Sequence, residues 1–193
     1  SNGRENLTST VLNKISSRYI ILEKIVFQSL KSFDHIIKIS TEKNVKIFVN
    51  CPRRVMEVYR NIKEKLDNTT GPLNLSYTGN NWGLCSNAIH FVDLFYYLVN
   101  YKENYKIKTN LKKRIFNAKR SSYYELKGKV SLKSSNSTLT LEDNIKFKSS
   151  NLEISKGNFK YNVSYDIKKN SFMMKKNKGI SKKINIPLQS KLT

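Results

Sequence analysis

The sequence has little cysteine and no long apolar run. Its 193 residues include two cysteines, Cys51 and Cys85, which lie far apart and form no CxxC pair. This spacing argues against a disulfide framework and a zinc site, so we expect reduced thiols, packed as small buried side chains, and no metal centre. No run approaches the roughly 18 apolar residues of a membrane span, and the N-terminus lacks a signal-peptide pattern. We therefore expect a soluble, cytoplasmic protein.

Acidic residues are also scarce. Only 14 Asp and Glu stand against 36 Lys and Arg, which gives a formal net charge of +22. Such a balance points to nucleic acid, because basic side chains neutralise phosphates. However, most of the cations are lysine rather than the arginine that makes two-point contacts, and they are spread along the whole chain. A basic nucleic-acid-binding domain is therefore the less favoured alternative, although such a surface would attract anionic ligands such as nucleotides.

The sequence does contain enough apolar surface for a core, with 38% hydrophobic residues. Its first part alternates helical and strand patterns, the rhythm of a parallel sheet wrapped by helices. The expected elements are a helix over 5–16, a strand over 18–24, a helix over 29–44, a strand over 46–50 and a helix over 52–66 that Pro52 opens. No GxGxxG or GxxxxGK[ST] turn is present, so we expect this chain to be a piece of a longer α/β protein.

The pattern changes in the later part of the chain. Residues 71–79 alternate like a strand, and residues 84–99 form an almost wholly apolar helix. From about residue 121, alternating segments broken by Gly, Asn and Ser indicate an antiparallel sheet with one wet face. Its expected strands cover 123–132, 137–142, 145–149, 151–156 and 159–167. The predicted fold class is therefore α/β followed by α+β, with the change near residue 50.

One stripe of the apolar helix is polar. At 100° per residue, Ser86, His90, Asp93 and Tyr97 fall on the same side of residues 84–99. This stripe needs a partner, a cavity or a ligand, because an unpaired buried carboxylate is costly. An aspartate near a histidine can raise its basicity and orient it, which suits general acid–base catalysis. A self-satisfied His–Asp pair within the core is an equally open alternative.

Two charged pairs follow predicted strands. Glu23 and Lys24 end the first strand, where doubly wound sheets bind ligands, and a lysine there can donate to a substrate oxygen. A solvated charge pair is the plainer alternative. Arg53 and Arg54 follow the second strand and could hold an anionic or polyhydroxyl ligand. Ordinary surface charges at a helix start are equally compatible with that pattern.

Trp82 is the only tryptophan and follows Asn80 and Asn81. An indole beside amide side chains is a common way to hold a sugar ring. A core tryptophan is the alternative.

Three segments resemble the Gfo/Idh/MocA family of glucose-fructose oxidoreductase and inositol dehydrogenase, and they occur in the right order. YIILEK is similar to the family's strand ending in Glu-Lys-Pro, with Ile25 in place of proline. NAIHFVDLF resembles its Asp-x-Gly-x-His-x-x-Asp helix, whose histidine and last aspartate match His90 and Asp93. AKRSSYYELKGKV resembles the strand that opens the substrate-domain sheet. Ser86 and Ala88 replace the first aspartate and the glycine, so the substrate pocket is expected to differ from that of relatives with the full motif.

The resemblance implies two domains. Residues 1–50 would be the C-terminal part of a Rossmann NAD(P)-binding domain. Residues 51–193 would be a substrate and oligomerisation domain, incomplete at its C-terminus, whose open, mostly antiparallel sheet builds a homo-oligomer. Without the glycine-rich turn, we expect this chain alone to bind NAD(P) poorly and to be inactive.

The implied activity is an NAD- or NADP-dependent oxidoreductase acting on a hydroxyl or keto group of a sugar, nucleotide-sugar or polyol. The phrases NVKIFVNCPRRVMEVY and GNNWGLCSNAIHFVDLF further indicate surface-polysaccharide metabolism. A non-catalytic relative that serves as a sensor or binding protein is the alternative.

The resemblance also implies residue roles. Lys24 and His90 would flank the reacting carbon beside the nicotinamide and handle the hydroxyl proton, while Asp93 orients His90 or binds a neighbouring hydroxyl. The expected cofactor-binding residues are Asn2, Glu23 and Lys24. The expected substrate-binding residues are Arg53, Arg54, Trp82, Ser86, Asn87 and Tyr97.

Overall fold

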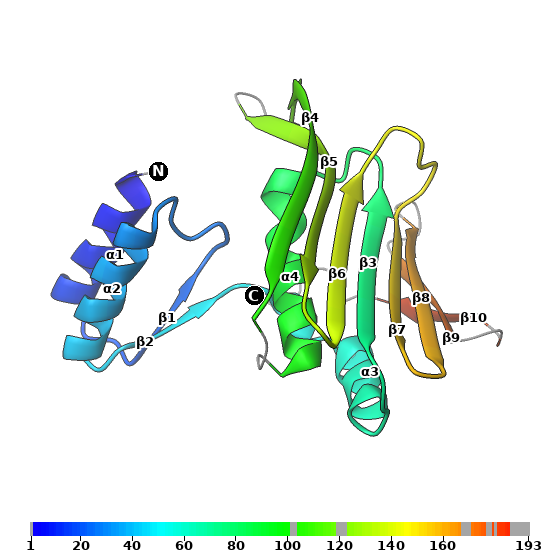
Figure 1. The fold of residues 1–193 in the computed structure, drawn as a ribbon. Helices are drawn as coiled ribbons and strands as arrows, with labels where there is room; N and C mark the ends of the chain where they lie inside the picture. The colour runs from blue at the N-terminus through cyan, green and yellow to red at the C-terminus, as the bar shows by residue number, and fades with distance from the viewer. Residues whose placement is uncertain are drawn as a thin grey trace. The chain divides into compact units, whose positions relative to one another are not determined.

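Two units make up the chain, Ser1–Pro52 and Arg53–Thr193 (Figure 1). The structure, a computed structural model, describes residues 2–100, 104–118, 123–166, 171–176, 179 and 181–185. No helix within these ranges is long and apolar enough to cross a membrane.

The first unit follows the predicted order of helix, strand, helix and strand. Its elements are α1 (Asn2–Lys14), β1 (Tyr19–Leu22), α2 (Leu30–Glu42) and β2 (Lys46–Val49). The two strands pair in parallel, with Tyr19 opposite Lys46. Apolar side chains of both helices and of the loops between elements form the core, which includes Leu12, Phe27 and Ile36. The predicted α/β character of this part is confirmed.

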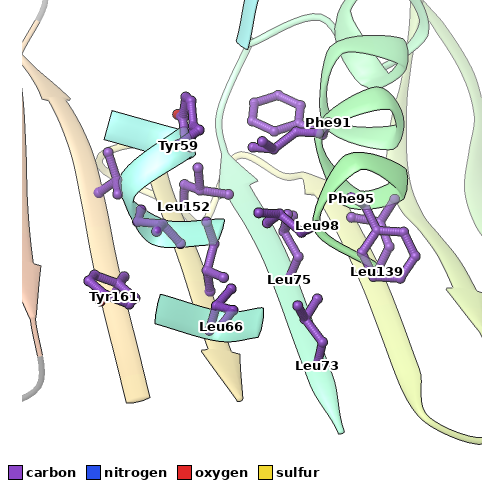
Figure 2. Close-up of a cluster of buried hydrophobic side chains, with 14 of the residues drawn as sticks. Tyr59, Leu66, Leu73, Leu75, Phe91, Phe95, Leu98, Leu139, Leu152 and Tyr161 are labelled. Carbon is purple, nitrogen blue, oxygen red and sulfur yellow. The ribbon is translucent and has the colours of Figure 1, made fainter. Parts of the chain in front are cut away.

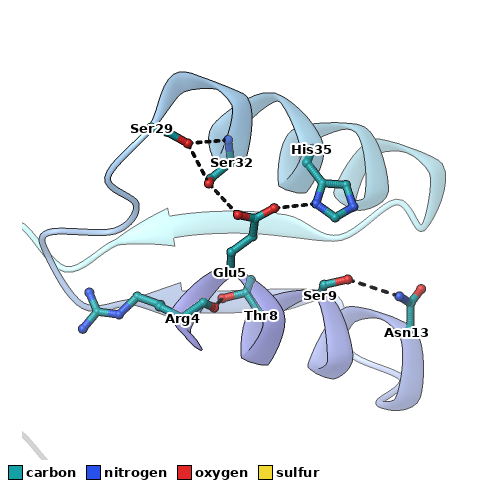
Figure 3. A network of polar contacts seen from close by, with 8 residues as sticks. All are labelled: Arg4, Glu5, Thr8, Ser9, Asn13, Ser29, Ser32 and His35. Atoms are coloured by element: carbon teal, nitrogen blue, oxygen red, sulfur yellow. Dashed lines mark hydrogen bonds and ion pairs between the residues drawn. The ribbon is translucent and has the colours of Figure 1, made fainter. Parts of the chain in front are cut away.

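A polar network joins the two helices of this unit (Figure 3). Oε1 of Glu5, on α1, lies 2.8 Å from Nδ1 of His35 on α2. The hydroxyl of Ser32 donates to the other oxygen of Glu5. Ser29 caps α2 by accepting the backbone N–H of Ser32 at 3.1 Å. The hydrogen bond from Ser32, and next that with His35, lower the pKa of Glu5.

The second unit is built on one eight-stranded sheet with the order β10-β9-β8-β7-β3-β6-β5-β4. Only β3 and β6 pair in parallel, and every other neighbouring pair is antiparallel. The open, mostly antiparallel sheet is therefore confirmed. Its strands are β3 (Leu73–Gly79), β4 (Lys106–Asn117), β5 (Tyr124–Lys133), β6 (Ser137–Asp143), β7 (Asn151–Lys156), β8 (Phe159–Asp166), β9 (Ser171–Lys176) and β10 (Ser181–Asn185).

Two helices, α3 (Glu57–Asp67) and α4 (Leu84–Val99), pack against one face of this sheet. The apolar residues that alternate along β3, β6 and β7 meet the apolar sides of the helices, and Figure 2 shows this core. Its fully buried members include Leu66, Leu94, Phe95, Leu139 and Ile154. The core thus fixes α4, which carries the predicted polar stripe, onto the centre of the sheet.

The opposite face of the sheet is polar. Successive strand pairings place Ser, Thr and Asn side chains on it, and none of these residues is buried. The same pairings add Lys106, Lys108, Lys129, Lys133, Lys160 and Lys175 to this face, against Glu142 and Glu153. We call it the open face. It is the wet face that the alternating pattern predicted.

The helix predicted from Pro52 is interrupted. A 3-10 turn, η1 (Pro52–Val55), comes first, and Met56 has extended backbone angles before α3 starts at Glu57. The break lets the two arginines of η1 contact α4 while α3 buries its own apolar side. Tertiary contacts therefore override the helical periodicity at this point.

One predicted strand is wrong, and three observed strands were not predicted. Residues 145–149 form a turn, in which the Asn144 side chain accepts the Lys146 N–H at 3.3 Å and its carbonyl accepts the Phe147 N–H at 3.2 Å. The long edge strand β4 was not expected, because nearly all of its residues are exposed and show no buried period. The register of β4 against β5 also shifts between Leu111 and Ile115, which breaks the alternation. The strands β9 and β10 were not predicted either.

Candidate active site

The turn after β1 holds Glu23 and Lys24 and is fastened by two other side chains. Nη1 of Arg4 donates to the carbonyl of Glu23 at 2.9 Å and also to the carbonyl of Ile25. The amide of Asn50, just beyond β2, donates to the Glu23 carboxylate. The Lys24–Ile25 peptide bond is cis, at the position where the resembling family has proline. These bonds fix the backbone on both sides of the half-buried Lys24.

Asn2, the third predicted cofactor-binding residue, lies in the first turn of α1. Its side chain is outside the described part of the chain.

Asp93 on α4 is paired with an arginine. Nε of Arg54 donates to Oδ2 of Asp93 at 2.9 Å, and Nη2 of the same guanidinium donates to Oδ1. This two-point geometry is the strong form of an ion pair. Cζ of the neighbouring Arg53 lies 4.3 Å from the centre of the Phe91 ring, and its Nη1 lies 3.5 Å from the Tyr59 hydroxyl. The two arginines that sequence analysis proposed for the substrate thus lie against α4, beside the predicted catalytic helix.

The N-terminus of α4 receives a carboxylate from the sheet. Gly83, the residue before the helix, offers no side-chain cap. Glu125 of β5 instead accepts the backbone N–H of Cys85 at 2.8 Å and that of Ser86 at 3.3 Å. The Ser86 hydroxyl also donates to Glu125. A carboxylate here satisfies free N–H groups and complements the helix dipole.

Cys85 is exposed rather than buried as expected. Partial burial raises the pKa of its thiol, and the nearby charge of Glu125 adds to this, against a smaller lowering by the backbone of Leu126. The thiol therefore stays protonated at neutral pH, and it is poorly suited to act as a nucleophile.

A second carboxylate holds the loop before α4. Asp143, at the end of β6, is 2% exposed. It accepts the backbone N–H groups of Asn81 at 2.9 Å, Trp82 at 3.1 Å and Gly83 at 3.2 Å. The Trp82 indole donates to the Glu142 carbonyl at 3.0 Å. This loop therefore has a fixed shape before any ligand binds.

Trp82 lies at the edge of the core. Its ring meets those of Tyr77 and Phe91 edge-on, with centroid distances of 4.9 and 5.6 Å. Its carbonyl accepts the side-chain amide of Asn87 at 2.7 Å. The structure therefore places Trp82 and Asn87 together at the start of α4, with the indole half-buried.

His90 is half-buried on α4, about one turn from both Ser86 and Asp93. Tyr97, one turn further on, lies under the Nζ of Lys63, 5.3 Å from its ring centre. Three residues of the predicted stripe, Ser86, Asp93 and Tyr97, thus contact charged residues of β5, η1 and α3 respectively.

Sequence reasoning missed three residues: Arg4, which holds the turn after β1 in the first unit, and Glu125 and Asp143, which hold the start of α4 in the second. Arg4 gives no signal in the sequence, because arginine on a helix surface is common. The two acids could have been found, since each lies close to an end of a predicted strand in a chain with only 14 acidic residues.

No family model matches the chain. A search of curated proteins also gives no match.

Solved structures do match it. The dehydrogenase MviM from Clostridium difficile shares 18% identity over 96% of this chain and 60% of its own, with a TM-score of 0.66. A Gfo/Idh/MocA family oxidoreductase from Vibrio cholerae shares 10% identity over 96% of this chain and 59% of its own, with a TM-score of 0.65. The transcriptional regulator Gal80p from Kluyveromyces lactis shares 12% identity over 95% of this chain and 58% of its own, with a TM-score of 0.66.

The chain thus spans about three-fifths of the length of these structures. At such low identities the likeness shows the fold alone. It is the fold of the family that the segments YIILEK and NAIHFVDLF resemble. This chain therefore has the fold of the Gfo/Idh/MocA oxidoreductases, a fold that it also shares with Gal80p.

Proposed function

We propose that this chain belongs to an NAD(P)-dependent oxidoreductase that acts on a hydroxyl or keto group of a sugar, nucleotide-sugar or polyol, in surface-polysaccharide metabolism. The observation that carries the proposal is helix α4. It presents His90 between Ser86 and Asp93, each held by a charged partner, in a chain with the fold of known oxidoreductases.

In this proposal, His90 gives or takes the proton of the substrate hydroxyl. Arg54 holds Asp93, which orients His90 or binds a neighbouring hydroxyl. Lys24 donates a hydrogen bond to the substrate oxygen. Arg53, Trp82, Asn87 and Tyr97 complete the set of substrate-binding residues that we propose.

The turn after β1 is suited to a cofactor. It follows the carboxyl end of a parallel strand, where open α/β sheets bind ligands. Arg4 and Asn50 hold its shape, so Glu23 and Lys24 keep fixed positions. We propose these two residues, with Asn2, as cofactor-binding. A nicotinamide, when bound, supplies or accepts the hydride, and the chain's own residues handle the proton.

The test is a pair of histidine variants in the full-length protein. General acid–base groups contribute about 10²–10⁴-fold to rate. His90→Ala should therefore lower kcat by about that factor, measured by nicotinamide absorbance with a panel of sugars, nucleotide-sugars and polyols. His35→Ala is the matched control, because His35 contacts Glu5 in the other unit. Equal turnover by wild type and His90→Ala would refute the assignment.

A non-catalytic function is the second candidate, and the match to the regulator Gal80p favours it. In that case the protein would bind a nicotinamide nucleotide or a sugar without turnover. Lys24→Ala and His90→Ala would then leave its activity unchanged. Stoichiometric binding with no change in nicotinamide absorbance across the panel would select this alternative.

A further inference from the structure

Lys127 on β5 is a buried cation beside the candidate active site. Only 6% of the surface of Lys127 is exposed to solvent. Its Nζ donates to the side-chain oxygen of Asn80 at 3.1 Å, and it lies 5.1 Å from the centre of the Phe116 ring. Both partners are neutral. A lysine this buried normally has an acidic partner, because removing a charge from water is costly.

Two acids on the same or the neighbouring strand, Glu125 and Asp143, are engaged with backbone N–H groups. Glu125, two residues before Lys127, accepts N–H groups of α4 with both oxygens. Asp143 accepts three N–H groups of the loop 81–83. Among the described residues, no ion pair of this unit includes Lys127. Lys127 is therefore a buried cation without an ion pair among the described residues, and its amine can accept an anionic ligand.

A second cation lies at the same ring. Cζ of Arg114, on β4, is 5.5 Å from the Phe116 ring centre, and the Lys127 Nζ is on the same ring at 5.1 Å. Phe116 thus has two cations at its ring, and Glu125 lies opposite it on β5. The second cation adds to the attraction of Lys127 for a negatively charged group.

The position of Lys127 relates it to His90. Lys127 and Glu125 are alternate residues of one strand, so their side chains share a face and lie roughly 7 Å apart along it. Glu125 bonds Ser86, which is one helical turn, about 5.4 Å, from His90. These steps put Lys127 within roughly 15 Å of His90. That span fits a sugar ring at His90 with a charged substituent at Lys127.

We propose that Lys127, held by Asn80, binds the anionic group of the substrate, a phosphate or carboxylate carried by the sugar. This inference rests on the proposed function for the identity of the sugar-bearing ligand. It narrows the substrate class from a sugar, nucleotide-sugar or polyol to an anionic sugar derivative, and it excludes neutral sugars and polyols. Lys127 acts in binding and specificity, and the proton transfer stays with His90.

The experiment is a binding titration without cofactor, followed by the emission of Trp82. This is the only tryptophan, and its backbone continues from Asn80 through Asn81. The probes are glucose 1-phosphate, glucuronate and neutral glucose, which separate phosphate from carboxylate recognition on similar rings. We expect at least one anionic probe to bind at least tenfold more tightly than glucose.

Lys127→Met should remove that preference, because it keeps the length of the side chain and loses the charge. Lys129→Met, an exposed lysine of the same strand, is the matched control and should bind like wild type. If Lys127→Met fails to fold by circular dichroism, Asn80→Ala supplies the test, since it removes the group that holds the amine. It should weaken anion binding several-fold.

Unchanged anion preference in Lys127→Met, or in Asn80→Ala where that variant is used, would overturn the inference. So would equal binding of all three probes, or binding of none, by the wild type. Because the titration involves no turnover, its result is separate from that of His90→Ala. Loss of catalysis without anion preference would leave the proposed function standing and remove only this inference.

Discussion

At the scale of single residues, the scarce acids hold the structure together. Glu5 links α1 to α2, Asp93 receives Arg54, and Glu125 and Asp143 take the N–H groups around the start of α4. With 36 basic and 14 acidic residues in the chain, few other carboxylates compete with these four for hydrogen-bond donors. Changes that neutralise an acid should therefore matter more than changes that neutralise a lysine.

Glu5 gives a pH-dependent prediction. Its pKa is lowered in the folded state from an ordinary 4.5, chiefly by Ser32 and then by His35. Its contribution to stability is therefore complete above that ordinary value and is lost as pH falls through the lower folded pKa. Thermal unfolding between about pH 6 and about pH 3 should show wild type losing more stability than Glu5→Gln. Glu42→Gln, at the exposed end of α2, should follow wild type. Parallel curves for wild type and Glu5→Gln would contradict this role.

The residue-level site was only partly predictable from the sequence. The spacing of Ser86, His90 and Asp93 on one stripe follows from helical geometry, and the helix formed as expected. Their partners could not be predicted, because Arg54 and Glu125 come from other elements, 39 residues away from Asp93 and Ser86 respectively. Periodicity predicts which side of a helix is polar, and it carries no information on what faces that side.

At the scale of elements, the loop between β3 and α4 depends on one buried carboxylate. Asp143→Asn keeps the size of the side chain but leaves one oxygen acceptor and turns an amide toward backbone donors. We expect the free energy of unfolding in urea to fall by about 2–4 kcal/mol.

Asp67→Asn is the control for that variant, because Asp67 is exposed at the end of α3 and pairs with Lys63 on the surface. Its effect should stay within about 0.5 kcal/mol. Equal unfolding midpoints for the two variants would show that the loop does not need Asp143.

Elements with a buried side were the ones that the sequence predicted well. Residues 84–99 and 151–156 match α4 and β7, because a core selects apolar residues at the helical or alternating period. Strand β4 lacks that signal, since it lies at the sheet edge and is exposed along its length. Gly128 of the facing strand β5 lies where the pairing with β4 becomes irregular. Its φ is +134°, and a Cβ added to it would lie 2.7 Å from the Leu111 Cα. Edge pairing depends on the backbone, which hydrophobic patterns do not report.

At the scale of the whole molecule, the open face bears on assembly. We propose that the chain forms homo-oligomers through this face. Lys106 lies directly opposite Lys133 on it, and six lysines there face two glutamates, of which Glu153 is paired with Lys160. Two copies brought together would therefore repel each other in dilute salt.

Self-association should strengthen with ionic strength. Raising salt from about 0.01 M to about 1 M shortens the screening length from roughly 30 Å to roughly 3 Å. Sedimentation velocity should show a larger oligomer fraction at high salt. Lys133→Glu should raise that fraction at low salt, whereas Lys65→Glu on α3 should have no effect. Association that weakens with salt would exclude the open face as the contact.

The place of β3 in the sheet has a consequence for how the chain is made. It is an early strand of its unit, yet its neighbours β6 and β7 begin only at Ser137 and Asn151. A ribosome adding roughly 5–20 residues per second needs several seconds to reach them after Gly79. During that interval Leu73 and Leu75 have no flanking strand, and only α3 and then α4 can shield them. The nascent chain is therefore expected to depend on those two helices, or on a chaperone, until the middle of the sheet closes around its oldest strand.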